Sequence, residues 1–396
     1  MRNRMKIKEI EAIPIKYPLK ETVYWAQGPI TERRMVLVKV KTDENIVGIG
    51  EAAIFGGPNI TTKTIVEEEL SEYVIGENPM YPEKIWEKMY MGTMQHGRRG
   101  VAITGMSGID IAIWDLIGKI KETPLYQLLG GFKNKVKAYA SAGFYTNDVK
   151  DIEILSKKMA GFVREGFTAV KMKLGRDPES KDEVVNQYKA VSRNSLELDF
   201  KRVRAVRKAV GGKTDLLVDP NNMWNVKTTI KMVNRLKDQN LYFIEEPIPT
   251  DDKEGLKIIN SSIDIPVAGC ETAYTRHEFK ELITNRCVDI VQPGVTWAGG
   301  MTEARKIAIM ASAHNMLCIP HSYNSAIDLA AAIHLTCSIP NSEYVEYDQT
   351  DGNALTMNLI NNPFGLDKEG FVKPSNKPGL GIELNDKFIE KYREGV

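Results

Sequence analysis

Residues 215–271 decide the fold, because they contain three short apolar runs that recur at a regular interval. The runs read DLLVD at residues 215–219, LYFIE at residues 241–245 and IPVAG at residues 265–269. An acidic residue ends or follows each run, and 26 residues separate Asp219 from Glu245 and Glu245 from Glu271. One strand and one helix fill such an interval, so the pattern predicts successive βα units of a parallel sheet. Since parallel strands end at the same edge, we expect the three carboxylates to lie together there.

The same alternation extends in both directions from this stretch. Further strands are predicted at residues 136–142, 167–174, 288–291, 316–320 and 343–347. Eight strands alternating with helices indicate a closed (β/α)8 barrel or an open doubly wound sheet. No G-x-G-x-x-G motif follows a strand and no P-loop motif occurs, which disfavours a nucleotide-binding sheet. We therefore predict an α/β fold with a modified (β/α)8 TIM-type barrel over residues 131–350.

Residues 1–130 have a different pattern and are predicted to form a separate α+β domain. Residues 35–40 and 47–52 read as two strands around a turn at residues 43–45. Residues 102–118 carry apolar side chains at helical spacing. Residues 351–396 follow the barrel as a third segment.

The composition is that of an ordinary globular protein and limits the function classes. Of 396 residues, 42% are hydrophobic and 27% charged, and 53 Lys and Arg nearly balance 52 Asp and Glu. The net charge of +1 disfavours a nucleic-acid partner. No apolar run approaches the roughly 20 residues of a membrane span, and no signal peptide is recognisable. The four cysteines form no C-x-x-C, so we expect a cytoplasmic protein with reduced thiols.

Two lysines lie in the strand predicted at residues 167–174, FTAVKMKL. Alternation places Lys171 and Lys173 on one face, and Val170 and Met172 on the other. In a barrel, helices cover the apolar face, so the lysines would point inward near the catalytic end of the strand. Burial and mutual repulsion are expected to lower the pKa of both ammonium groups, which suits a base near neutral pH. The alternative is an edge strand with solvated lysines.

The three acids would repel one another unless a cation lies among them. Oxygen ligands at a partly open site suit Mg²⁺, with Mn²⁺ as an alternative. Any single acid could instead be a helix cap or a surface charge. His321 follows the strand predicted at residues 316–320, at the same rim as the acids. Glu346 lies in the last predicted strand, where a solvated edge charge is the alternative to a role in the site.

Taken in order, these residues resemble the enolase superfamily and, within it, the mandelate racemase-like group. The matching positions are Lys171-Met172-Lys173 as a K-x-K motif, Asp219 with Asn221, Glu245 in IEEP, Glu271, His321 and Glu346. Residues 108–119, GIDIAIWDLIGK, look like the family's capping-domain helix, and residues 377–384, KPGLGIEL, look like its C-terminal segment. The resemblance covers nearly the whole chain, and the ordered set is much more specific than any one motif.

The resemblance implies a capping domain at residues 1–130, completed by residues 351–396, over a barrel at residues 131–350. It also implies Mg²⁺ bound by Asp219, Glu245 and Glu271, and removal of the proton α to a carboxylate, by a Lys or His base, as the shared chemistry.

The resemblance also assigns roles to the other matching residues. Lys173 would be the base, and His321 would return a proton to carbon or protonate a leaving hydroxyl. Lys171 would lie near the substrate carboxylate, Glu346 would hydrogen-bond that carboxylate, and Asn221 would orient the groups around the metal.

Specificity in this family depends on capping-domain loops, which are expected here around residues 17–28 and 94–100. Trp25, His96, Arg98 and Arg99 are the candidate substrate contacts, with surface or core packing as the alternative for each. The implied partner is a small-molecule carboxylate, with no nucleic acid or membrane, and the family usually forms symmetric homo-oligomers.

The chain departs from the family at one position. The family often pairs its histidine with an aspartate at the end of the sixth strand, where this chain has Gly294 in DIVQPGV. Without that carboxylate His321 should be a poorer base, although it could still donate a proton to a leaving group. The sequence does not place Asp289, Asp328 or Asp348, any of which could substitute.

We therefore predict a Mg²⁺-dependent dehydratase, a lyase that converts a sugar acid (an aldonate or aldarate) to a 2-keto-3-deoxy acid. The first alternative is a racemase, epimerase or cycloisomerase that acts through the same enediolate. A Schiff-base aldolase using Lys173 and a non-catalytic oligomeric scaffold are the others.

Overall fold

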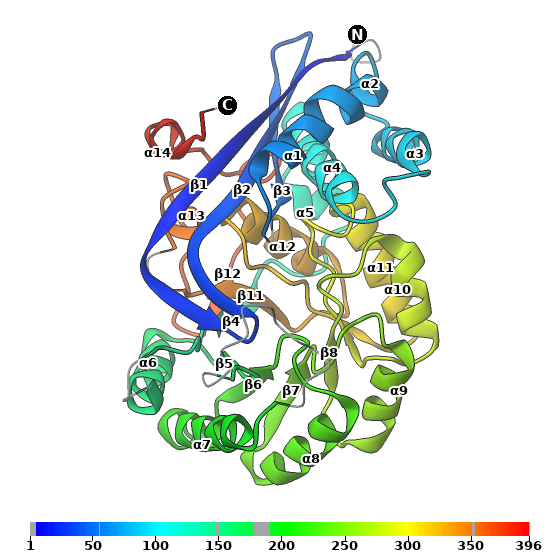
Figure 1. Ribbon diagram of the computed structural model, residues 1–396. Helices are drawn as coiled ribbons and strands as arrows, with labels where there is room; N and C mark the ends of the chain where they lie inside the picture. Colours follow the sequence, from blue (N-terminus) through cyan, green and yellow to red (C-terminus); the bar gives the residue numbers. More distant parts are fainter. Residues whose placement is uncertain (1–4, 55, 148–150, 178–190, 351–352, 396) are drawn as a thin grey trace.

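The computed structural model describes residues 5–54, 56–147, 151–177, 191–350 and 353–395. Figure 1 shows an N-terminal unit above an array of strands flanked by helices. The N-terminal unit has a three-stranded antiparallel sheet, in the order β1 (Ile7–Trp25), β2 (Gly28–Thr42), β3 (Val47–Ala53). Its helical segments are α1 (Asn59–Thr64), a π-helical turn at Ile65–Leu70, α2 (Ser71–Val74), α3 (Pro82–Thr93) and α4 (Val101–Ile120).

The sheet of this unit confirms the predicted turn at residues 43–45, which joins β2 to β3, but its first strand was not predicted. β1 is an edge strand and contains Pro14 and Pro18, together with charged residues that interrupt the apolar alternation. Proline is tolerated on an edge strand because its missing N–H can face away from the ladder. The sequence pattern of β1 is therefore weak although the strand is long.

Helix α4 packs closely against β3. A Cβ atom added at Gly50 would lie 2.1 Å from the carbonyl oxygen of Gly108, so both the strand and the helix need glycine at this crossing. By length and composition α4 could cross a membrane, but 89% of its apolar window is buried inside the protein. Its buried Asp110 accepts hydrogen bonds from the N–H and hydroxyl of Thr302, which ties the N-terminal unit to the barrel.

The central unit has the predicted alternation of strands and helices, and its strands are mostly shorter than predicted. The strands are β4 (Val136–Ser141), β5 (Ala169–Lys173), β6 (Asp215–Asp219), β7 (Leu241–Glu245), β8 (Val267–Gly269), β9 (Ile290–Val291), β10 (Leu317–Cys318) and β11 (Tyr344–Asp348). The helices between them are α6 (Asp151–Glu165), α7 (Arg193–Val210), α8 (Val226–Leu236) with a 3₁₀ turn at Lys237–Gln239, α9 (Lys253–Ser262), α10 (Thr275–Thr284), α11 (Gly300–Ala313) and α12 (Ala326–Ser338). The short helix α5 (Leu125–Leu128) precedes β4.

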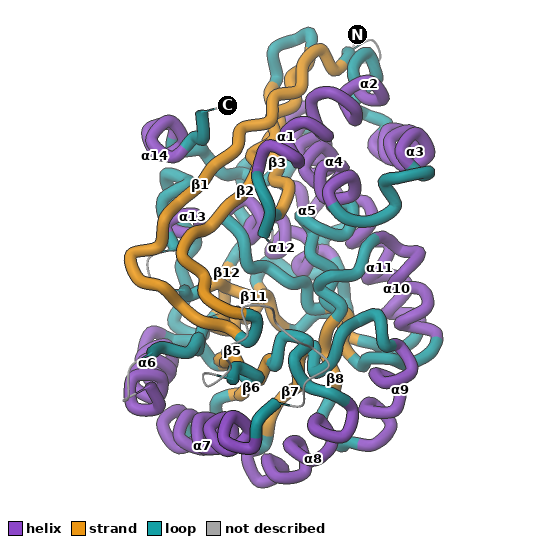
Figure 2. Tube along the Cα trace, viewed as in Figure 1, coloured by secondary structure: helices purple, strands orange, loops and turns teal. Residues whose placement is uncertain are grey.

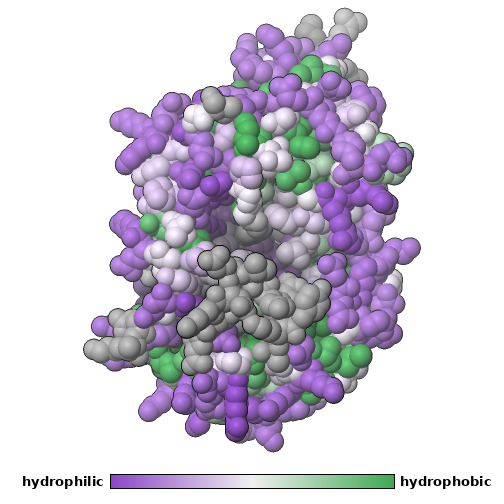
Figure 3. Space-filling model, in the orientation of Figure 1, coloured by the Kyte–Doolittle hydropathy of each residue, from purple (hydrophilic) through white to green (hydrophobic). Residues whose placement is uncertain are grey.

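These strands form one curled parallel sheet in the order β10-β9-β8-β7-β6-β5-β4-β11, with helices on its outer face (Figure 2). Within the described ranges no ladder pairs β10 with β11, although the N–H of Cys318 donates to the Asn341 carbonyl at 2.7 Å. The TIM-type barrel is therefore modified at this seam. Hydrophilic side chains dominate the surface in Figure 3, and the hydrophobic ones there are scattered.

Apolar side chains of several strands fill the barrel interior, and polar side chains follow them at the C-terminal ends of the same strands. We call these polar ends the rim. Ala169, Leu217, Phe243 and Tyr344 belong to one buried cluster that fills the barrel interior. Two residues further along the same strands and faces stand Lys171, Asp219, Glu245 and Glu346.

After β11 the chain returns to the N-terminal unit. The tail contains α13 (Ala354–Met357), β12 (Phe371–Val372), which pairs antiparallel with β4, and α14 (Asp386–Tyr392). Asp115 of α4 accepts hydrogen bonds from the N–H groups of Ile49 at 3.0 Å and Leu380 at 2.8 Å. A Cβ atom at Gly118 would lie 2.3 Å from the Cα of Gly379. The capping unit is thus completed by the C-terminal segment, as expected.

Candidate active site

The predicted catalytic and metal-binding residues converge at one end of the barrel. Lys173, Asp219 and Glu245 are the last residues of β5, β6 and β7, and Glu271 follows β8. His321 follows β10 and Glu346 lies within β11. Each of these side chains is buried, as is Lys171. The equal spacing of the acids along the sequence therefore corresponds to neighbouring strands of one rim.

Lys171 and Lys173 point inward, and each ammonium group meets carboxylates. Nζ of Lys171 lies 2.7 Å from Glu346 and 3.9 Å from Asp219, and it also contacts Glu245. Lys173 forms an ion pair with Asp219.

The prediction that the pKa of both lysines falls is wrong. Burial lowers the pKa of Lys171, but the carboxylates of Glu245 and Glu346 outweigh burial and raise it well above its ordinary value. Burial and the charge of Lys171 lower the pKa of Lys173, and the carboxylate of Asp219 reverses the sign. The prediction counted repulsion between the lysines but not these neighbouring acids.

His321 takes its carboxylate partners from other strands. Its Nδ1 lies 2.9 Å from Glu271 and 3.0 Å from Glu346. Burial would lower the pKa of this imidazole, but the two carboxylates raise it well above the ordinary value. A Cβ atom at Gly294 would lie 3.9 Å from Cδ2 of His321, so this glycine stands beside the histidine.

The other candidate partners of His321 differ in their surroundings. Asp348 forms an ion pair with Arg33, and Asp289 accepts hydrogen bonds from Val267 and Asn260. Asp328 accepts a hydrogen bond from Thr296. Burial raises the pKa of Asp328 to about 6, against an opposing effect of the nearby His321 charge.

A second set of polar groups orients the acids. Asn221 donates to Asp219 through its backbone N–H at 2.8 Å and its side-chain amide at 3.1 Å. Gln292, which no sequence motif singles out, donates to Glu245 at 2.9 Å. Asn221, Glu246 and Cys270 have φ angles of 45°, 35° and 76°, so the chain turns left-handed just after three successive strands. A left-handed backbone conformation costs energy for residues other than glycine, and such residues are concentrated at functional sites.

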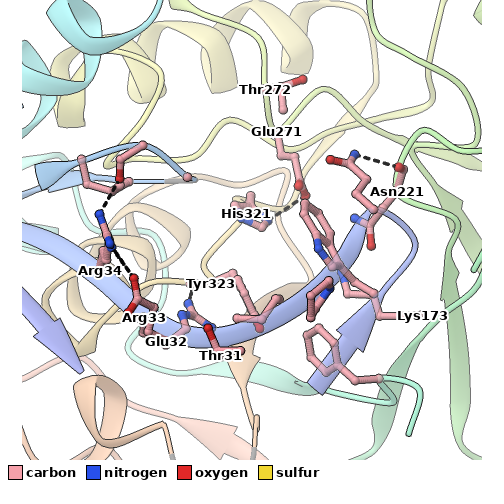
Figure 4. Close-up of a pocket in the computed structure, with 18 of the residues that line it drawn as sticks. Thr31, Glu32, Arg33, Arg34, Lys173, Asn221, Glu271, Thr272, His321 and Tyr323 are labelled. Carbon is pink, nitrogen blue, oxygen red and sulfur yellow. Dashed lines mark hydrogen bonds and ion pairs between the residues drawn. The ribbon is translucent and has the colours of Figure 1, made fainter. Parts of the chain in front are cut away.

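A cavity of about 930 Å³ opens between this rim and the β1–β2 hairpin of the cap. Lys173, Asn221, Glu271 and His321 line it from the barrel, and Trp25 lines it from the cap. Figure 4 shows Lys173 and Asn221 on one side and Arg34 and Glu32 on the other. The deeper Lys171, Asp219, Glu245 and Glu346 are not among the lining residues described.

The second cap segment expected to contact substrate, residues 94–100, is not among the described residues that line this cavity. Arg98 is exposed and is not among the described residues that line it. His96 pairs with Glu69 at 2.7 Å, and Arg99 pairs with Glu278. The sequence did not single out Phe144, Tyr323 or the run from Glu32 to Arg34, all of which line the cavity. Their positions depend on long-range packing, because they come from distant parts of the chain.

The donor set at the rim fits a divalent cation. Five buried carboxyl groups stand against two ammonium groups and one imidazole: Asp219, Glu245, Glu246, Glu271 and Glu346 against Lys171, Lys173 and His321. Burial, with the charges of Glu271 and Asp219, raises the pKa of Glu246 to about 8. An excess of buried oxygen ligands suits Mg²⁺.

One group of possible metal-ligand atoms among the described residues differs from the predicted trio. Single atoms of Glu245, His321 and Glu346 lie within 4.8 Å of one another. Lys171 contacts both carboxylates of that group, so a positive charge already lies between them. Asp219, Glu245 and Glu271 therefore remain our prediction for the metal ligands.

Comparisons with known proteins agree with this architecture. Residues 9–130 match the mandelate racemase / muconate lactonizing enzyme N-terminal domain, and residues 155–388 match the enolase C-terminal domain-like family. The chain is 35% identical over 359 residues to an arabinonate dehydratase of Saccharolobus solfataricus, covering 91% of this chain and 90% of that protein. It is 29% identical over 398 residues to a D-galactarolactone cycloisomerase of Agrobacterium fabrum, covering 98% and 99%.

A solved structure of a racemase from Streptomyces coelicolor A3(2) with bound magnesium has a TM-score of 0.86 and 26% identity, covering 98% of this chain and all of that one. The fold and the residues of the rim define a capped barrel of the class whose active sites lie at the C-terminal ends of the strands. The chain belongs to the enolase superfamily, in its mandelate racemase and muconate lactonizing enzyme group.

Proposed function

We propose that this protein is a Mg²⁺-dependent dehydratase of a sugar acid. The observation that carries the proposal is that Lys173, which ends β5, and His321, which follows β10, line one cavity beside a cluster of carboxylates. A base and an acid on different walls of one chamber suit the loss of a proton and a hydroxyl from neighbouring carbons. The similarity to an arabinonate dehydratase over most of both chains supports the same reaction class.

In the proposed reaction Lys173, whose ion pair with Asp219 would be lost once Asp219 binds the metal, takes the proton from the carbon next to the substrate carboxylate. The bond from the following carbon to its hydroxyl then breaks, and the hydroxyl leaves as water with a proton from His321. The enol that remains tautomerises to a 2-keto-3-deoxy acid. Lys171 would supply positive charge near the substrate carboxylate, and Glu346 would hydrogen-bond it.

Asp219, Glu245 and Glu271 would hold the metal, with Asn221 orienting Asp219. Bound Mg²⁺ supplies positive charge next to the substrate carboxylate, where negative charge develops as the proton leaves. Gln292 fixes one oxygen of Glu245, and His321 contacts Glu271. These contacts limit the freedom of the ligand side chains before any metal arrives.

A screen of aldonates and aldarates with MgCl₂ tests the proposal, with keto-acid formation read out by semicarbazide. Lys173→Met is expected to remove turnover and keep the fold, as judged by circular dichroism. Lys137→Met removes an exposed lysine of β4 and should retain activity. Keto-acid formation by Lys173→Met at the wild-type rate would exclude Lys173 as the base.

The same screen distinguishes the alternatives. Incorporation of solvent deuterium without loss of water would favour isomerisation, the reaction class of the cycloisomerase relative. Trapping of a substrate adduct by borohydride would indicate a Schiff base on a lysine instead. If none of the acids reacts or exchanges, the proposed function is wrong.

A further inference from the structure

The cavity has a second charged wall opposite Lys173, formed by three successive residues of β2. We define this distal wall as Glu32, Arg33 and Arg34, all of which line the cavity. Figure 4 shows Arg34 and Glu32 on the far side of the cavity from Lys173 and Asn221. A substrate whose reacting carboxylate lies at the barrel rim would point its other end toward this wall. The charge of the distal wall therefore bears on which substrates fit.

The positive charge of Arg33 is already balanced by a carboxylate. Its Nη1 lies 3.3 Å from a carboxylate oxygen of Asp348, and both side chains are almost fully buried. Its other terminal nitrogen donates to the Tyr323 carbonyl, and its guanidinium lies 3.8 Å from the centre of the Tyr323 ring. Both terminal nitrogens of this buried guanidinium are already engaged, so the side chain cannot offer them together to another anion without losing these contacts.

Arg34 is neutralised in the same way by its neighbour in the wall. Its Nε and Nη2 lie 2.7 and 2.6 Å from Oε1 of Glu32, and its Nη1 donates to the Gly57 carbonyl at 2.9 Å. Glu32 also pairs with Lys16 at 2.9 Å, but Lys16 is partly exposed and is not among the described residues that line the cavity. Burial alone would raise the pKa of Glu32, and the hydrogen bonds from Lys16 and Arg34 lower it instead, so the carboxylate is ionised at neutral pH.

We infer that the distal wall selects monoacids, so that the substrate is an aldonate with a neutral hydroxyl end and not an aldarate with a second carboxylate. This inference rests on the proposed function. Both arginines of the wall have carboxylate partners, so a second substrate carboxylate would have to displace Glu32 or Asp348 to form a full ion pair with either guanidinium. Hydroxyl groups need no such rearrangement, because they can share the existing donors and acceptors.

The inference predicts that removing the charge of Glu32 shifts specificity toward diacids. Glu32→Gln leaves Arg34 with the Gly57 carbonyl and an uncharged neighbour. The ratio of kcat/KM for an aldarate to kcat/KM for the aldonate of the same length and configuration should then rise by about tenfold, and less at high salt. Glu44→Gln removes the same charge from the exposed turn between β2 and β3 and serves as the matched control.

Wild-type enzyme is first tested with both acid classes and MgCl₂. Dehydration of aldonates in preference to aldarates, with the shift in Glu32→Gln and not in Glu44→Gln, would support the inference. Preference of the wild type for aldarates, or the same ratio in both variants, would overturn the inference and leave the dehydratase proposal standing. Failure to dehydrate any sugar acid would overturn both.

Discussion

His334 makes the stability of the fold depend on pH below neutrality. This side chain of α12 is buried, and its Nδ1 accepts a hydrogen bond from the Tyr126 N–H at 3.0 Å. Its Nε2 lies 3.1 Å from the Leu380 carbonyl, so these partners assign the neutral ring with its proton on Nε2. A second proton on Nδ1 would face the Tyr126 N–H. Burial lowers the pKa of His334 from 6.5 to about 4, against an opposing effect of the Leu380 hydrogen bond.

The sign of the effect follows from proton uptake. The unfolded chain protonates this imidazole near pH 6.5, and the folded protein does so only near pH 4. The unfolded state binds more protons between these values, so the stabilisation is complete above the higher pKa and is lost as the pH falls through the window. At about 1.36 kcal/mol per pH unit, the full loss is about 3 kcal/mol.

Urea unfolding of the wild type and of His334→Gln tests this reasoning. Glutamine offers an acceptor and a donor but does not titrate, and the other titrating groups cancel in the comparison. The advantage of the wild type over the variant in free energy of unfolding should shrink by about 2.5 kcal/mol between about pH 7.5 and about pH 4.5. An advantage that is the same at both pH values would refute the assignment.

Two further changes test the metal site and the closure of the cap. Glu245→Gln should reduce the rise in Tm caused by MgCl₂ and weaken Mg²⁺ binding by about tenfold or more, whereas Glu254→Gln, an exposed change on α9, should keep the wild-type response. An unchanged response in Glu245→Gln would exclude it as a ligand. Gly118→Ala should lower the free energy of unfolding by about 1–3 kcal/mol, because its Cβ would overlap Gly379. At Gly161 on α6 a Cβ would meet only Nη2 of Arg164, at an ordinary 3.8 Å. Gly161→Ala should therefore be neutral or stabilise by up to about 1 kcal/mol, and equal effects of the two alanines would contradict the close contact.

The sequence predicts the rim because strand alternation is strict. In β5 the inward face reads Ala169, Lys171, Lys173, and the same period places Asp219 and Glu245 above apolar residues of their own strands. The architecture could be predicted for the same reason, since regular alternation of strands and helices leaves few arrangements.

The partners of these residues could not be predicted in the same way. The ion pair between Arg33 and Asp348 joins positions 315 residues apart, and the contact of His321 with Glu346 depends on which side chains turn toward each other at the seam of the barrel. The sign of the lysine pKa shifts was wrong for this reason, because the direction depends on carboxylates that only the fold brings near. The proposed selection of monoacids depends on the same kind of long-range contact.

The net charge of the rim affects the binding of both the metal and the substrate. With Glu246 uncharged, because its pKa is raised to about 8, the other four carboxylates against two ammonium groups and a protonated imidazole leave a net charge of −1. Burying such an excess costs stability, so it is expected only where function requires it. One divalent cation more than balances this excess, whereas a substrate carboxylate entering first would add to it. The metal should therefore bind before the substrate, and a monoacid, which brings one further negative charge, is easier to accommodate than a diacid.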